Sequence, residues 1–116
     1  MTFNHFEVVV VPFPFTDKAK TKRRPALILS SAKTFNQPAG HSVMAMIISA
    51  HNALWPLDVT ITDLAQSGLP APSVVRMKLF TLDHRLVLST IGVLAPEDQQ
   101  AVRKTLSRLL HDGLQG

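Results

Sequence analysis

The chain has 116 residues, enough for one domain (residues 1–116) of ordinary size built around one hydrophobic core. At 46% hydrophobic and 17% charged, its composition is that of a globular protein and excludes an intrinsically disordered chain. Without cysteine there is neither a disulfide nor a thiolate metal site, and no segment resembles a signal peptide or a membrane span. We therefore expect a cytoplasmic protein that makes no membrane contact.

The positive charge is concentrated in one stretch. The net charge is only +4, yet several basic residues fall close together: Lys18, Lys20, Lys22, Arg23 and Arg24. Such clusters favour a polyanionic partner, because each contact with a phosphate releases counterions. We interpret a second group near the C-terminus, Arg103, Lys104 and Arg108, as solvated surface charge.

The first half of the chain is typical of short buried strands joined by loops. Residues 7–11 form a β-branched run, and we expect this strand to end at Pro12, because proline donates no ladder hydrogen bond. Residues 25–29 and 43–49 predict two further strands. Residues 32–41 carry asparagine, proline and glycine, which predicts a loop.

The second half predicts more strands and then a helix. Strand-like runs occur at residues 57–61, 73–77 and 86–94, and the Gly- and Pro-containing residues 62–72 predict a loop. From Pro96 onward apolar residues recur at helical spacing (Val102, Leu106, Leu109 and Leu110), with Gly113 as the expected C-cap. These elements together predict a bent antiparallel sheet or partial barrel with one amphipathic helix against it.

Polar residues at strand edges are the candidates for chemistry. The sequence has no phosphate-binding loop and no HExxH motif, and its histidines are scattered. Arg24 directly precedes a strand, Ser49 ends one, and Arg76 lies within an apolar run. Each has a structural alternative: Arg24 as a solvated charge, Ser49 as a strand terminator, and Arg76 in an ion pair with Glu7 or Asp83.

Several segments, taken in order, resemble the PemK/MazF-like toxin family. They are EVVVVPFPFTD at 7–17, KRRPALILS at 22–30, IIS at 47–49 and GLPAPSVVRMKLFTLD at 68–83. The resemblance spans nearly the whole chain. It implies a mainly β fold, an SH3-like small β-barrel with helices, and usually a homodimer. It also implies cleavage of single-stranded mRNA without a cofactor, and inhibition by a cognate antitoxin.

The resemblance also implies site residues. Arg24 and Ser49 would be catalytic, with Ser49 in place of the more usual threonine, and Arg76 would bind the substrate. We further predict Glu7 as a catalytic residue, and Arg23, Lys78 and His51 as substrate-binding residues. Phe6 stands where the family has a turn glycine, and Lys78 stands where some members carry a carboxylate.

The implied chemistry is attack by the 2′-hydroxyl of the RNA on the adjacent phosphate. Arg24 suits stabilisation of the phosphorane but is a poor base, because its pKa lies above ~12. Glu7 and His51 both remain open as the general base. Phe13, Phe15 and Trp55 are candidate platforms for bases; the alternatives are that the phenylalanines plug a barrel end and that Trp55 is a dimer contact.

Two other functions are compatible with the same pattern. One is a non-catalytic toxin that binds a protein target such as DNA gyrase, since one fold serves several functions. The other is a degenerate family member that only binds RNA, an alternative that the residues at positions 6 and 78 leave open.

Overall fold

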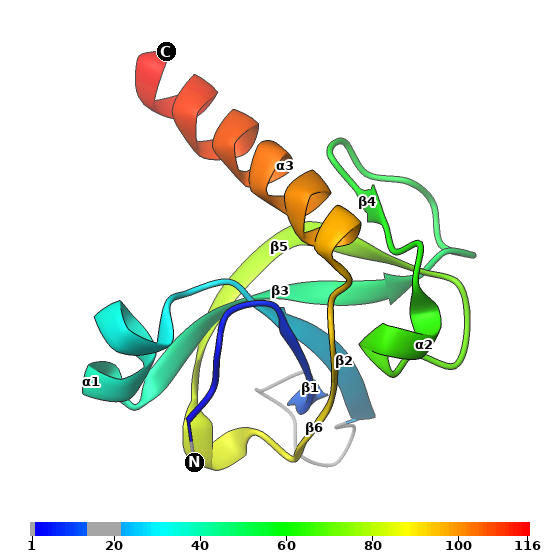
Figure 1. Ribbon diagram of the computed structural model, residues 1–116. Helices are drawn as coiled ribbons and strands as arrows, with labels where there is room; N and C mark the ends of the chain where they lie inside the picture. Colours follow the sequence, from blue (N-terminus) through cyan, green and yellow to red (C-terminus); the bar gives the residue numbers. More distant parts are fainter. Residues whose placement is uncertain (1, 14–21) are drawn as a thin grey trace.

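The computed structural model describes residues 2–13 and 22–116, which form a curled antiparallel sheet and one long helix (Figure 1). The strand order is β4-β5-β3-β2-β1-β6. The strands are β1 Glu7–Phe13, β2 Lys22–Ile28, β3 His41–Ser49, β4 Val59–Thr60, β5 Ser73–Asp83 and β6 Ser89–Val93, and the helices are α1 Gln37–Ala39, α2 Leu64–Ser67 and α3 Pro96–Gln115. The expected small β-barrel with a C-terminal helix is confirmed, as a curled half-barrel. The candidate Phe15 and the basic Lys18 and Lys20 lie outside the described residues.

Apolar side chains are buried on both faces of the sheet. Val8 and Leu27 belong to a cluster that reaches Val102 on α3, whereas Val9 and Ala26 belong to a second cluster on the opposite face. Since successive side chains of a strand alternate between faces, this explains why β1 contains four valines in succession, at residues 8–11. Each fully buried valine stabilises the fold by roughly 1.5–3 kcal/mol.

The expectation that Pro12 ends the first strand was wrong. β1 continues to Phe13, with Pro12 opposite Arg23 of β2. The carbonyl of Val10 accepts from Leu88 on the β6 side of β1, so the nitrogen of Pro12, two residues further on, points to that same side. The pairing with β6 ends at Val10. The missing N–H of Pro12 therefore costs no ladder hydrogen bond.

Two expected loops contain short helices. Residues 32–41 form a π-helical turn, Ala32–Asn36, that leads into α1, and residues 62–72 contain α2. Ser31 caps the first of these and Asp63 caps the second, each through its side-chain oxygen. Both segments are too short to show a helical periodicity in the sequence.

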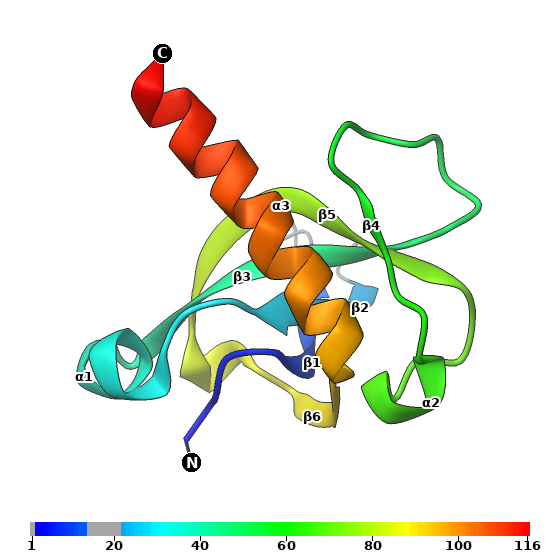
Figure 2. The same ribbon diagram turned by 45° about the horizontal axis from the view of Figure 1, so that its top comes forward.

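Several element boundaries also differ from the expected ones. β4 is confined to two residues, β5 extends beyond residue 77 to Asp83, and a 3-10 turn at His84–Leu86 delays the start of β6. Gly113 does not cap α3, which continues to Gln115. The C-terminal half of α3 projects beyond the sheet (Figure 2), where Leu114 is 85% exposed.

Phe6 occupies a position with a glycine-like backbone. Its φ of 67° lies in the left-handed region, which glycine adopts without strain. The phenyl ring is nevertheless 4% exposed and packs beneath the Arg103 guanidinium at 4.8 Å. Burying the ring contributes roughly 1.5–3 kcal/mol, more than the strain of about 1–2 kcal/mol, so phenylalanine is tolerated there.

Candidate functional site

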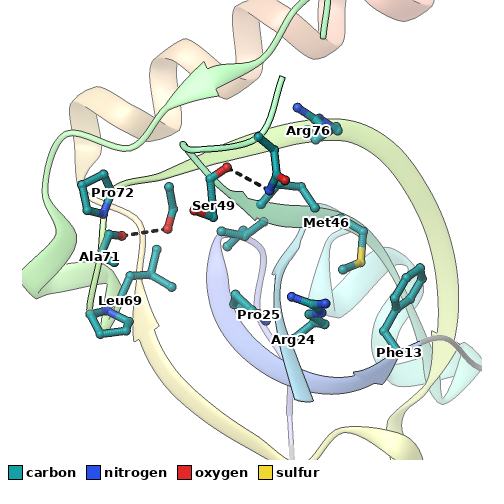
Figure 3. A pocket seen from close by; sticks show the side chains of 14 residues that line it. Phe13, Arg24, Pro25, Met46, Ser49, Leu69, Ala71, Pro72 and Arg76 are labelled. Carbon is teal, nitrogen blue, oxygen red and sulfur yellow. Dashed lines mark hydrogen bonds between the residues drawn. The ribbon is translucent and has the colours of Figure 1, made fainter. Parts of the chain in front are cut away.

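A cavity of about 410 Å³ opens where β2 and β3 separate (Figure 3). The two strands pair only between residues 26–28 and 44–46, so the start of β2 and the end of β3 diverge. Residues 24–25 line one side of the cavity and residues 47–49 line the other, while residues 69–72 close it. This volume lies within the range of small-ligand pockets.

Arg24 is the open cationic group of this cavity. It lies opposite Val11 of β1, lines the cavity and is exposed. Among the residues that the structure describes, none forms an ion pair with it. Its planar guanidinium is therefore available to an anion, and the fork geometry suits two phosphate oxygens.

Ser49 and Asn52 face the same cavity from the end of β3. The Ser49 Oγ accepts a hydrogen bond from the backbone N–H of His51 at 3.3 Å, which leaves its hydroxyl proton free to be donated. The Asn52 side chain donates to the Ser49 carbonyl at 3.2 Å and is thereby fixed at the cavity wall. The sequence alone does not mark Asn52 as a site residue, because an asparagine after a strand is an ordinary turn residue.

Arg76 also lines the cavity, but three of the five N–H donors of its guanidinium bond to the protein. It donates to both carboxylate oxygens of Asp58, at 3.2 and 3.0 Å, and to the carbonyl of Ala53 at 2.7 Å. The two charged side chains are only 9% and 5% exposed. The structural alternative for Arg76 was an ion pair with Glu7 or Asp83; the observed partner is Asp58, on the loop that precedes β4.

Asp58 is held in its ionised form. Burial opposes its ionisation, but hydrogen bonds from Arg76 and from the Trp55 backbone N–H outweigh this, so the pKa of Asp58 lies below its ordinary value. Residues 53–58 are consequently tied to β5 by a buried charged pair. Removing either partner would leave a buried charge uncompensated.

Lys78 and Arg23 lie near the cavity without lining it. Lys78, on β5, places its ammonium 5.3 Å from the ring centre of Phe13, which does line the cavity. Arg23 adjoins Arg24 on β2, and the alternation of side chains directs the two arginines to opposite faces of the strand.

The structure does not bring the two candidate bases into the cavity. Glu7 lies at the start of β1 opposite Val93 of β6, four residues along the strand from the position that faces Arg24, and accepts from the backbone of Asn4. β3 ends at Ser49, and His51 lies in the turn that follows, outside the cavity lining. Its expected place on the Ser49 face required the strand to continue, which it does not.

The closing wall of the cavity is anchored by buried contacts. Gly68 ends α2 with a φ of 74°, and a side chain there would collide with the Ile91 carbonyl of β6. Asp98, 2% exposed at the start of α3, accepts from the Thr62 backbone and hydroxyl at 2.9 and 2.7 Å. These contacts fix the segment that runs through α2 into residues 69–72.

A second polar cluster lies at the far end of the β3–β5 pair. The Ser42 hydroxyl is 2.7 Å from His84 Nε2, and burial lowers the pKa of His84. Hydrogen bonds from Arg85 hold the pKa of Asp83 well below its ordinary value. Ser42 is fully buried, so we interpret this cluster as structural.

Neither a metal centre nor a membrane helix is found in the described residues. Within 2–13 and 22–116, no three His, Cys, Asp or Glu side chains are grouped so that they could hold a metal ion. None of the helices in these ranges is long and apolar enough to cross a membrane.

Known proteins share both the sequence pattern and the fold. Residues 4–110 match the family model described as PemK-like, MazF-like toxin of type II toxin-antitoxin system. A MazE–MazF structure from Deinococcus radiodurans is similar with a TM-score of 0.76, at 24% identity over 96% of this chain and 98% of that chain. An endoribonuclease in complex with its cognate antitoxin, from a mycobacterial species, gives a TM-score of 0.72 at 15% identity, over 95% of this chain and 94% of that chain.

The Mycobacterium tuberculosis toxin MazF-mt6 gives a TM-score of 0.67 at 22% identity, over 88% of this chain and 93% of that chain. At such identities these three likenesses establish the fold. No curated protein sequence matches the chain. The family match covers almost the full length, and the chain therefore belongs to the PemK-like, MazF-like toxin family of type II toxin–antitoxin systems.

Proposed function

We propose that this toxin cleaves single-stranded mRNA at the cavity between β2 and β3. The observation that carries the proposal is Arg24, an exposed arginine that lines the cavity and has no ion-pair partner among the described residues. Ser49 faces it across the diverging strands. Membership of the toxin family and the fold shared with an endoribonuclease support the same activity.

The proposed reaction uses the RNA itself as the nucleophile. The 2′-oxygen forms a bond to the adjacent phosphorus and the bond from phosphorus to the 5′-oxygen breaks, leaving a cyclic phosphate and a free 5′-hydroxyl. The guanidinium of Arg24 neutralises the charge that accumulates on the phosphorane oxygens. The hydroxyl of Ser49 donates to the scissile phosphate. No metal ion takes part in these steps.

We propose that the proton transfers use water. Among the described residues, the cavity lining contains no carboxylate and no imidazole. The 2′-hydroxyl proton would therefore pass to a hydroxide or water molecule, and the departing 5′-oxygen would take a proton from water. We expect the logarithm of the cleavage rate to rise steadily with pH near neutrality, and His51→Ala to leave that profile unchanged. A bell-shaped profile that loses one limb in His51→Ala would instead make His51 the base.

The proposed partners follow from the family. We expect a cognate antitoxin to cover the RNA-binding surface and the toxin to form a homodimer, as the resemblance implies, and we expect both to act in the cytoplasm. Two of the similar structures are toxins solved with their antitoxin. Sedimentation of the purified chain, alone and with its antitoxin, tests both partners.

A binding-only function is the second candidate. The same lack of a titratable base among the described lining residues favours it, because RNA binding needs Arg24 but no proton transfer. In this case the toxin would bind RNA or a protein target without breaking RNA.

One experiment separates the two candidates. The purified protein is incubated with a long unstructured RNA in excess EDTA, beside Arg24→Ala, and the fragment ends are analysed. Fragments with cyclic-phosphate ends from the native protein alone are the expected result. Intact RNA across a broad range of sequences, with binding retained, would overturn the nuclease and leave the binding-only function.

A further inference from the structure

Trp55 is an exposed aromatic side chain that contacts Arg76, a residue of the cavity wall. It lies in the loop between β3 and β4, which extends beyond the sheet (Figure 2), and is 46% exposed. The Arg76 guanidinium carbon lies 4.7 Å from the indole ring centre. Because Arg76 also lines the cavity, a single side chain connects the indole to the proposed RNA site.

The loop holds the indole in a fixed position. Asp58 accepts from the Trp55 backbone N–H at 2.9 Å, and the same carboxylate accepts from Arg76. Arg76 also donates to the carbonyl of Ala53, at the other end of this segment. A ligand that binds the ring therefore does not have to order the loop, which removes a common cost of binding.

A tryptophan that is both exposed and held in a fixed position is unusual for a purely structural role. A structural tryptophan gains its stabilisation by burial, whereas this residue is 46% exposed. One ring face is covered by a guanidinium whose charge Asp58 already compensates. What remains is a rigid, flat apolar surface beside a cationic cavity. Those are the two elements with which proteins bind single-stranded nucleic acids.

We propose that Trp55 stacks on an unpaired base of the RNA whose phosphate is bound at Arg24. In this arrangement Arg76 is a positioning residue that supports the ring from behind and makes no phosphate contact. The inference rests on the proposed function, since it assigns a base-binding subsite to the same RNA. Its chemistry is sequence-tolerant, because every base has a stacking face.

The chain provides its own probe for this subsite. Trp55 is the only tryptophan and there is no tyrosine, so the emission of the protein reports on this ring. The probe ligand is a fluorescently labelled RNA with 2′-O-methyl groups, which cannot be cleaved through its own 2′-oxygen. We expect it to quench the tryptophan emission along a saturation curve that matches the anisotropy of the label.

Substitutions at Trp55 measure how much the ring contributes to RNA binding. Trp55→Leu is expected to weaken RNA binding by about tenfold, as loss of one stacked base does, and Trp55→Phe to retain most of the affinity. Leu54→Ala is the matched control, because Leu54 is the neighbouring exposed apolar residue, at 78%. On cleavable RNA, Trp55→Leu is expected to raise KM and leave kcat nearly unchanged.

The results of these experiments distinguish failure of the Trp55 subsite from failure of the proposed nuclease activity. RNA that binds by anisotropy without changing the tryptophan emission, and with equal affinity for Trp55→Leu, would overturn the subsite while cleavage in EDTA still supports the nuclease. Emission that shifts with protein concentration alone, and not with RNA, would make Trp55 a contact between copies and overturn the subsite. Loss of both binding and cleavage in the native protein would overturn both proposals.

Discussion

Two arginines line one cavity and differ in almost every respect. Arg24, at the start of β2, is exposed and has no ion-pair partner among the described residues. Arg76, on β5, is 7% exposed and donates to Asp58 and Ala53. The same side-chain chemistry therefore has two roles here, one that we propose for a phosphate ligand and one that stabilises the fold.

The difference originates in the strand order. β2 separates from β3 after a short paired region, so nothing in the described sheet covers Arg24. β5 is paired on both sides at Arg76, by β3 directly and by β4 next to it, and the loop before β4 delivers Asp58. A family resemblance assigns both arginines to the substrate, whereas the contacts favour only the first as a phosphate ligand.

The largest expected effect is on stability, in Arg76→Ala. This change leaves the Asp58 carboxylate buried without its partner, and we expect the free energy of unfolding to fall by about 3–5 kcal/mol. Urea denaturation measures it. The double variant Arg76→Gln with Asp58→Asn, which removes both charges, should recover much of the loss. A fall of less than about 1 kcal/mol in Arg76→Ala, the level of surface pairs, would contradict the structural role.

The next effect is on activity, in Arg24→Ala. Removing the phosphorane contact should slow RNA cleavage by roughly 100- to 1000-fold. The free energy of unfolding should change by no more than about 0.5 kcal/mol, as for other exposed residues. Arg23→Ala is the matched control, since it removes the same charge from the other face of β2. Equal losses of activity in the two variants would indicate a general effect of charge rather than a phosphate contact.

A smaller effect is expected on the pH dependence of stability. The folded-state pKa of Asp58 lies below its ordinary value of 3.8. The stabilising contribution of this carboxylate is therefore complete above about pH 4 and is lost as the pH falls through the lower, folded-state pKa. Urea denaturation from pH 6 downward should show a shallower loss in Arg76→Gln/Asp58→Asn than in the native chain. Parallel curves would contradict the ionised buried pair.

Much of the fold follows from local patterns in the sequence. The valine run of β1, the apolar runs of β2 and β3, and the helical spacing after Pro96 all produce the elements that they predict. Local sequence patterns do not predict the elements whose bounds depend on contacts with other parts of the chain. Pro12 continues a strand only because β6 stops short of it. The π-helical turn Ala32–Asn36 and α2 begin at single capping side chains, Ser31 and Asp63, and show no periodicity in the sequence.

The site could be predicted only in part. Arg24 and Ser49 line one cavity because the start of β2 and the end of β3 lie at the same end of two neighbouring antiparallel strands. The partner of Arg76 was not predictable, since Asp58 reaches it through a loop and through the pairing of β4 with β5. Asn52 and the support beneath Trp55 likewise depend on that loop's conformation, for which the sequence carries no periodic signal.

The most direct test of the two arginine roles is the salt dependence of RNA binding. Affinity for the 2′-O-methyl RNA is measured across salt concentrations for the native protein, Arg24→Ala and Arg76→Gln/Asp58→Asn. For single strands each phosphate contact contributes about 0.7 to the slope of log affinity against log salt. We predict a slope smaller by about 0.7 in Arg24→Ala and an unchanged slope in the double variant, even where its affinity is lower. An unchanged slope in Arg24→Ala, or the same reduction in the double variant, would contradict the account.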